Sequence, residues 1–169
     1  MMSRLSLCTS IDIKKLLYIS FANSIISYCI TVWGSTSNTA LQPLIKLQKM
    51  IIKKIYNFQF SSSLAFKLLN LLDIHQMYKY NSVVFVYKTI KGISPESISN
   101  IIKNVQINTN NYSTRYKANL RKPQFTIKVA TNSIAWKGTE IFNSLPESLK
   151  AEHSLKTFKK NSKDYFLNK

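Results

Sequence analysis

The acidic, cysteine and histidine side chains of this chain are too scattered to form a known type of catalytic centre. Two-metal nucleotidyl transfer needs carboxylates that cluster around magnesium ions. No two of the seven carboxylates are adjacent, and no Asp-Asp pair follows an apolar strand. The carboxylates are Asp12, Asp73, Glu96, Glu140, Glu147, Glu152 and Asp164. The four thiol and imidazole side chains lack the spacing of zinc ligands; they are Cys8, Cys29, His75 and His153. We therefore expect no catalytic residue, no metal site and no cofactor.

Motifs for nucleophilic catalysis and phosphate binding are also missing. The chain contains no G-x-S-x-G sequence, which is the motif that exposes a nucleophilic serine. Its three glycines are too few for a glycine-rich phosphate loop. The sequence predicts that this chain is not an enzyme on its own.

Basic side chains are the chemistry that remains. The 169 residues include 24 Lys and Arg against 7 Asp and Glu, a net charge of +17, and the stretches 13–72 and 97–139 contain no acid. Such a balance favours a polyanionic partner, nucleic acid first and an anionic membrane second. An AT-rich coding sequence would also enrich Lys, but it would supply Asp and Glu too, so it leaves the shortage of acids unexplained.

Two segments are candidates for contact with RNA or DNA. Lys and Arg neutralise phosphates, while Tyr and Phe can stack on unpaired bases. The first segment is a basic arm with interleaved aromatics, represented by Tyr112, Arg115, Tyr116, Lys117, Arg121, Lys122 and Lys128. The second is one face of an expected helix, represented by Lys46, Lys49 and Lys53. The arm could instead be a loop packed on the body, and the lysine face could simply be solvated; both alternatives stay open.

The hydrophobic pattern predicts a mainly α fold. We expect a helical bundle (about residues 11–103), then a small α+β tail with short irregular strands and a C-terminal helix. Three parts follow from this: a helical region 1–103, an Asn-rich linker 104–111, and a region 112–169 with the basic arm, a glycine turn at Gly138 and the last helix. In the helix expected from residue 39 to about 56, an apolar stripe lies opposite the lysines; it comprises Leu44, Leu47, Ile51 and Ile55.

The expected first helix, 11–32, belongs to the longest uncharged stretch, 16–45. We expect it to be buried on most sides rather than to span a membrane, because hydroxyl and amide side chains interrupt the run. Its inward stripe would include Phe21, Ile25 and Tyr28, so a charge placed at Phe21 or Ile25 is expected to unfold the domain.

The compartment follows from the two cysteines. Cys8 and Cys29 give no disulfide framework, so the sequence predicts an intracellular, reducing environment.

Four stretches, in order over about residues 11–167, resemble the region downstream of the polymerase in LINE-type (non-LTR, jockey-like) retrotransposon reverse transcriptases. They are S-Y-C-I-T-V-W-G at 27–34, the helix 44–55 with L-Q-K at 47–49, Y-S-T-R at 112–115, and I-A-W-K-G at 134–138 with F-N-S-L-P at 142–146, before the F-K-K of the closing helix at 158–160. Two positions depart from the family pattern: Phe142 stands where tryptophan is common, and Thr139 where proline is common.

The resemblance implies a catalytically inactive C-terminal fragment of an RNA-directed DNA polymerase of a mobile element, located in the nucleus or cytoplasm of a eukaryotic cell. The palm and its aspartates would lie upstream of residue 1, so no active-site residue carries over. Residues 1–103 would be a thumb-like or post-thumb region, and the partners would be RNA or DNA and the parent polymerase domains. Two alternatives remain, a stand-alone helical protein-interaction module and a small membrane-anchored protein.

Overall fold

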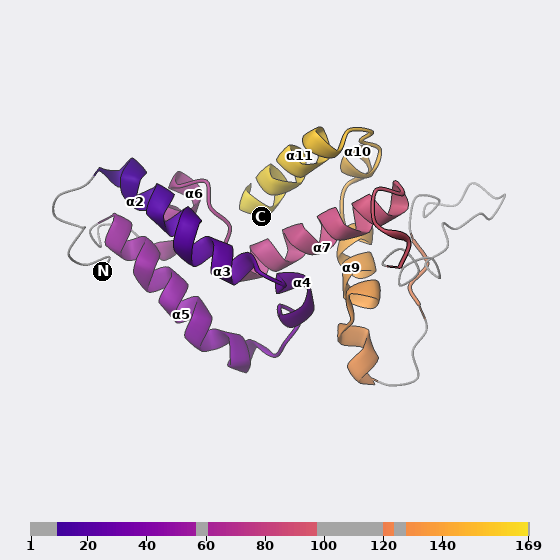
Figure 1. Ribbon diagram of the computed structural model, residues 1–169, viewed down its shortest axis with the longest axis horizontal. Helices are drawn as coiled ribbons and strands as arrows, with labels where there is room; N and C mark the ends of the chain where they lie inside the picture. The colour runs from indigo at the N-terminus through magenta and orange to yellow at the C-terminus, as the bar shows by residue number, and fades with distance from the viewer. Residues whose placement is uncertain (1–9, 57–60, 98–119, 124–127, 169) are drawn as a thin grey trace. The chain divides into compact units, whose positions relative to one another are not determined.

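The computed structural model describes residues 10–56, 61–97, 120–123 and 128–168, and it is mainly helical, as predicted (Figure 1). Its elements are α2 (Ile11–Leu17), the π-helical turn η1 (Tyr18–Asn23), α3 (Ser24–Ser27), α4 (Ile30–Trp33), α5 (Asn38–Ile55), α6 (Ser62–Leu68), α7 (Ile74–Ile90), the 3-10 helix η2 (Lys128–Asn132), α9 (Ile134–Asn143), α10 (Glu147–Lys150) and α11 (Leu155–Asn168).

The chain divides into two compact units. Unit 1 is Met1–Met77 with Leu167–Lys169, and unit 2 is Tyr78–Phe166. The division therefore falls inside α7, and the Asn-rich stretch 104–111, where the sequence predicts a linker, lies outside the described residues.

Local side-chain and backbone signals mark the ends of several helices. Ser37 and Ser61 cap α5 and α6 by accepting hydrogen bonds from the backbone N–H groups three residues on. Asp73 caps α7, because its carboxylate accepts from the Gln76 N–H at 2.8 Å while the Gln76 side chain accepts from the Asp73 N–H at 3.2 Å. Gly92, at φ 68°, ends α7 in a Schellman motif.

The N-terminal run is not the single helix that the sequence predicts. It passes from α2 through η1 into α3, and breaks at Cys29, whose φ of 50° is left-handed. The Ser20 and Ser24 hydroxyls donate to the carbonyls four residues earlier, at 2.9 and 2.6 Å. Such back-bonds compete with the helical ladder. The Trp33 indole N–H donates to the Tyr28 carbonyl at 2.7 Å and so bridges the break.

The buried side of this run also differs from the expectation. Phe21, Ile25 and Tyr28 are 63, 75 and 77 % exposed, so the predicted inward stripe is wrong. Buried positions recur every four residues instead, at Tyr18, Ile26 and Ile30, with Ala22 partly buried. A π-helical turn has more residues than an α-helical one, so it shifts the inward side away from the positions that a 3.6-residue period predicts.

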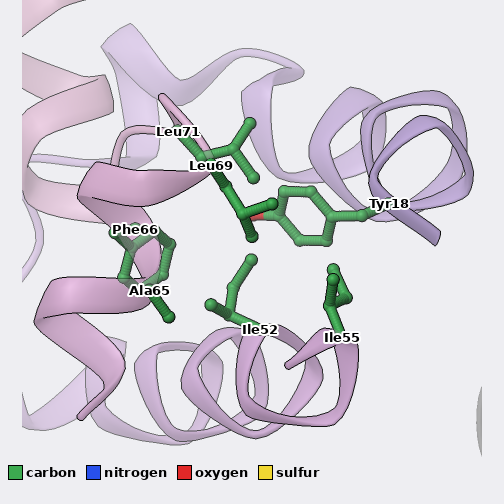
Figure 2. Packing of buried hydrophobic residues seen from close by; sticks show 7 residues of the cluster. All are labelled: Tyr18, Ile52, Ile55, Ala65, Phe66, Leu69 and Leu71. Atoms are coloured by element: carbon green, nitrogen blue, oxygen red, sulfur yellow. The ribbon is translucent and has the colours of Figure 1, made fainter. Parts of the chain in front are cut away.

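The core of unit 1 forms around the Tyr18 ring. Figure 2 shows this ring between side chains of α5 and those of the α6 region. The buried cluster comprises Tyr18, Ile52, Ile55, Ala65, Phe66, Leu69 and Leu71. Tyr18 thus joins η1 to α5 and to the α6 region.

Unit 2 is built on α7. The Phe158 ring of α11 stacks on the Tyr87 ring with centroids 3.9 Å apart, and the Tyr87 hydroxyl donates to the Glu152 carbonyl at 2.7 Å. Ser162 and Phe166 complete the buried side of α11. α11 is thereby fixed in rotation on α7.

Gly138 is not the turn that the sequence predicts, because it lies inside α9. A Cβ atom there would come within 3.1 Å of both the Val86 side chain of α7 and the Ile134 side chain of its own helix. The glycine therefore permits a close approach of α9 to α7.

The predicted short strands are not found in the described part of the tail. Leu120 forms only an isolated bridge, and residues 128–132 are a 3-10 helix that leads into α9. The expectation is wrong for 128–130, and the rest of the predicted strand region, 112–119 and 124–127, lies outside the described residues.

Candidate nucleic-acid interface

The three lysines predicted to share one face of α5 differ in their exposure. Lys46 and Lys49 are exposed and Lys53 is half-buried. In the part of the chain that the structure describes, none of the three forms an ion pair. Because residues at spacings of three, four and seven share a helix face, these ammonium groups form one positively charged strip.

The buried side of α5 is not the apolar stripe that the sequence predicts. The buried residues are Leu41, Gln48, Ile52 and Ile55, whereas Leu47 is exposed. By helical spacing, the buried side is turned by roughly 60° from the predicted one. The lysine strip therefore flanks the buried side rather than lying opposite it.

Gln48 accounts for this rotation. Its side chain is 1 % exposed, and its amide donates to the Tyr18 hydroxyl at 2.8 Å and to the Leu72 carbonyl at 3.3 Å. Its oxygen accepts from the Ile74 N–H at 3.1 Å, a donor that the start of α7 leaves open. Burial raises the pKa of Tyr18 more than its bond to Gln48 lowers it. A polar residue is buried here because every group of its amide has a partner.

The described end of the basic arm is fixed to α9. The Asn143 side-chain amide forms two hydrogen bonds with the backbone of Leu120: it donates to the carbonyl at 2.8 Å and accepts from the N–H at 2.9 Å. The Lys150 ammonium donates to the Asn143 carbonyl at 2.7 Å, and burial lowers the pKa of Lys150 despite the opposing charge of Glu147. Asn143 therefore acts as a clamp for the backbone at Leu120 within unit 2.

Lys122 is held within the molecule. Its ammonium lies 3.0 Å from Glu140 and 4.5 Å from the centre of the Trp136 ring, and Lys137 contacts the same carboxylate at 3.3 Å and the same ring at 5.2 Å. Partial burial by itself raises the pKa of Glu140, but its bonds to the two lysines outweigh that effect and bring the pKa below 4.5. Arg121 is exposed, so it is the better placed of the two for phosphate contact.

The candidate contacts fall in different units of the chain. Lys46, Lys49 and Lys53 belong to unit 1, whereas Arg121 and Lys122 belong to unit 2. Tyr112, Arg115, Tyr116 and Lys117 lie outside the described residues, and the structure gives no side-chain position for Lys128.

Sequence reasoning missed the structural roles of Gln48 and Asn143. Both lie within stretches that carry the family resemblance, so the motifs mark these positions. The residue type alone, however, does not reveal which groups a polar side chain bonds to. Trp136 is half-buried beside two lysines, while Phe142 is buried.

Metal sites and membrane-spanning helices can be examined in the described residues. Among them, no group of three or more His, Cys, Asp or Glu side chains could hold a metal ion. Within the same residues, no helix is long and apolar enough to cross a bilayer.

Comparisons with protein-family models, with curated proteins and with solved structures find no match. The residues of the chain are therefore the basis for a functional proposal.

Proposed function

We propose that this chain is a catalytically inactive C-terminal part of an RNA-directed DNA polymerase of a mobile element, and that it contributes basic contacts to RNA or DNA inside the cell, in the nucleus or cytoplasm. The observation that carries the nucleic-acid role is the strip of lysines on α5, which no carboxylate of the described residues neutralises. Unneutralised cations on one helix face are what a phosphate backbone requires.

The polymerase origin is supported by what the resembling motifs do. Gln48 joins three segments of unit 1, Trp33 bridges the break after Tyr28, and Asn143 clamps Leu120. Gln48 in particular is costly to replace, because the buried groups that bond to its amide would lose their partners. This is the kind of position at which a family pattern persists.

A salt series of binding to labelled RNA and DNA tests the nucleic-acid role. Wild-type protein should bind, with log K falling as log salt rises. Replacing Lys46, Lys49 and Lys53 with Gln should flatten that slope by about 0.7 to 0.9 for each phosphate that the protein no longer neutralises. The same measurement on an arm variant, with Arg115, Lys117, Arg121 and Lys122 changed to Ala, compares the two segments. Absence of salt-dependent binding by the wild type would refute the role.

The expected absence of polymerase activity is tested separately. Primer extension on poly(rA)/oligo(dT) with magnesium or manganese should show no incorporation above a control without protein, since no carboxylate cluster is present in the sequence. Extension that depends on the integrity of this chain would overturn the proposal.

A second candidate function is a helical protein-interaction module without a nucleic-acid role. The observation that favours it is the exposure of Phe21, Ile25, Tyr28 and Val32 on the N-terminal helices, because exposed apolar residues are frequent at interaction sites. The two candidates differ in the salt series: an apolar interaction surface leaves nucleic-acid binding absent, whereas the first candidate requires it.

A further inference from the structure

We infer that unit 2 carries a nucleic-acid contact face of its own, on α11, formed by Lys156, Lys159 and Lys160. The inference rests on the proposed nucleic-acid role and deepens it, because it adds a binding surface to the arm and to the α5 strip. The partner is recognised by its phosphate backbone, which is common to RNA and DNA.

The rotation of α11 about its own axis is fixed by its buried side. Phe158 is fully buried against Tyr87, and Ser162 and Phe166 are buried on the same side of the helix. At 3.6 residues per turn, the three lysines fall within about 100° of one another on a neighbouring side. Lys156 and Lys160 are exposed and Lys159 is half-buried. Their ammonium groups are therefore presented together from a rigid support.

Within the isolated chain, the three positive charges on α11 are electrostatically unfavourable. Lys156 repels Lys159 and Lys160 at spacings of three and four residues. It also lies in the first turn, where the helix dipole disfavours cations, and this turn contains no acid. Asp164, the one carboxylate in the sequence of α11, forms no ion pair with the three lysines among the described residues. A polyanion would relieve this repulsion.

The helix dipole acts differently on the basic end of α5. The last turn of α5 contains Lys53 and Lys54, where cations are favourable to the helix itself. The lysines in the first half of α11 receive no such stabilisation from the dipole of their own helix. We attribute them to an external anion.

Nucleic acid fits this face better than an anionic membrane does. A helix that lies on a bilayer needs an exposed apolar side next to its basic side. The aromatic side of α11 is occupied, since Phe158 and Phe166 are buried. A phosphate backbone needs only the ammonium groups.

The test compares two triple variants that lower the net charge equally. The first is Lys156→Gln, Lys159→Gln, Lys160→Gln. The control is Lys67→Gln, Lys79→Gln, Lys88→Gln, which removes scattered charges from α6 and α7, with Lys79 and Lys88 on opposite sides of α7 by helical spacing. Binding to labelled single-stranded RNA and to labelled duplex DNA is measured over a salt series, with phosphatidylserine vesicles as a third probe.

We expect the α11 variant to bind RNA or DNA about 10- to 100-fold more weakly near physiological salt, with a salt slope lower by about 2 to 3, and the control to change much less. Equal behaviour of the two variants would overturn the α11 face while leaving the proposed function intact. Loss of vesicle binding without loss of nucleic-acid binding would also overturn it, and wild-type protein that binds neither nucleic acid would refute both proposals.

A second measurement guards against loss of the fold. Lys and Gln have similar helix propensities, and the α11 variant removes repulsion between lysines, so it should melt no lower than the wild type. A lower melting temperature would contradict the electrostatic argument and overturn the inference.

Discussion

The N-terminal run and the C-terminal helix α11 have comparable apolar patterns but opposite environments. α11 packs Phe158 fully buried against Tyr87, whereas the N-terminal run leaves Phe21 63 % and Ile25 75 % exposed. The run is joined to α5 through Tyr18, whose hydroxyl bonds to Gln48. The difference teaches that the spacing of apolar residues shows which of them could be buried. Which of them are buried depends on whether another part of the chain packs against them.

Replacing a phenylalanine in each region gives the largest contrast. Phe158→Ala should destabilise unit 2 by about 3 to 5 kcal/mol, because it leaves a cavity beside Tyr87. Phe21→Ala should change stability by no more than about 0.5 kcal/mol, since the side chain is mainly in solvent. Denaturant unfolding followed by circular dichroism measures both.

This contrast reverses the sequence-based expectation that a charge at Phe21 or Ile25 unfolds the domain. Phe21→Glu should fold and remain in the same compact state. Comparable losses in Phe158→Ala and Phe21→Ala would mean that the N-terminal run is buried after all, and the comparison would fail.

The polar clamp of unit 1 should come next in size. Gln48→Leu leaves the Ile74 N–H and the Leu72 carbonyl without their bonds to the Gln48 amide, and should cost about 1 to 3 kcal/mol. Gln42→Leu, on the exposed side of the same helix, is the matched control and should be nearly neutral. A neutral Gln48→Leu would show that packing around Tyr18 holds the N-terminal run without help from the amide.

The clamp of unit 2 is expected to be somewhat weaker. Asn143→Ala removes two hydrogen bonds to Leu120 and should cost about 1 to 2 kcal/mol. It should also speed tryptic cleavage after Arg121, because the released backbone can enter the protease. Asn132→Ala, an exposed position just before α9, serves as the control. Unchanged cleavage would place the anchor of this segment elsewhere.

The ion pairs of Glu140 with Lys122 and Lys137 should have the smallest effect on stability. Because its pKa is lowered in the folded protein, the carboxyl contributes stability above its ordinary pKa of 4.5, and this contribution is lost as the pH falls through the folded value. Glu140→Gln should therefore reduce stability slightly near neutral pH, by less than about 1 kcal/mol since the pair is partly exposed. The gap between variant and wild type should close at about pH 3. Urea midpoints at both pH values measure it, and a gap that persists in acid would contradict the assignment.

The sequence by itself determined what depends on neighbouring residues. The mainly α content is confirmed, and the Asp73 cap and the Gly92 stop likewise depend on interactions within a few residues. The excess of cations and the exposed position of Lys46 and Lys49 on α5 could also be inferred from the sequence. The family resemblance and the nucleic-acid role remain proposals, since they need a partner that no single chain contains.

Tertiary structure decided which polar residues go inside and which apolar residues stay out. Gln48 is buried because Tyr18, Leu72 and Ile74, which lie far from it in the sequence, together satisfy its amide. Gly138 fits its place in α9 because it has no Cβ atom to crowd the side chain of Val86, 52 positions earlier in the sequence. Hydrogen-bond partners and close approaches of this kind come from distant parts of the chain, so no local period or motif could specify them.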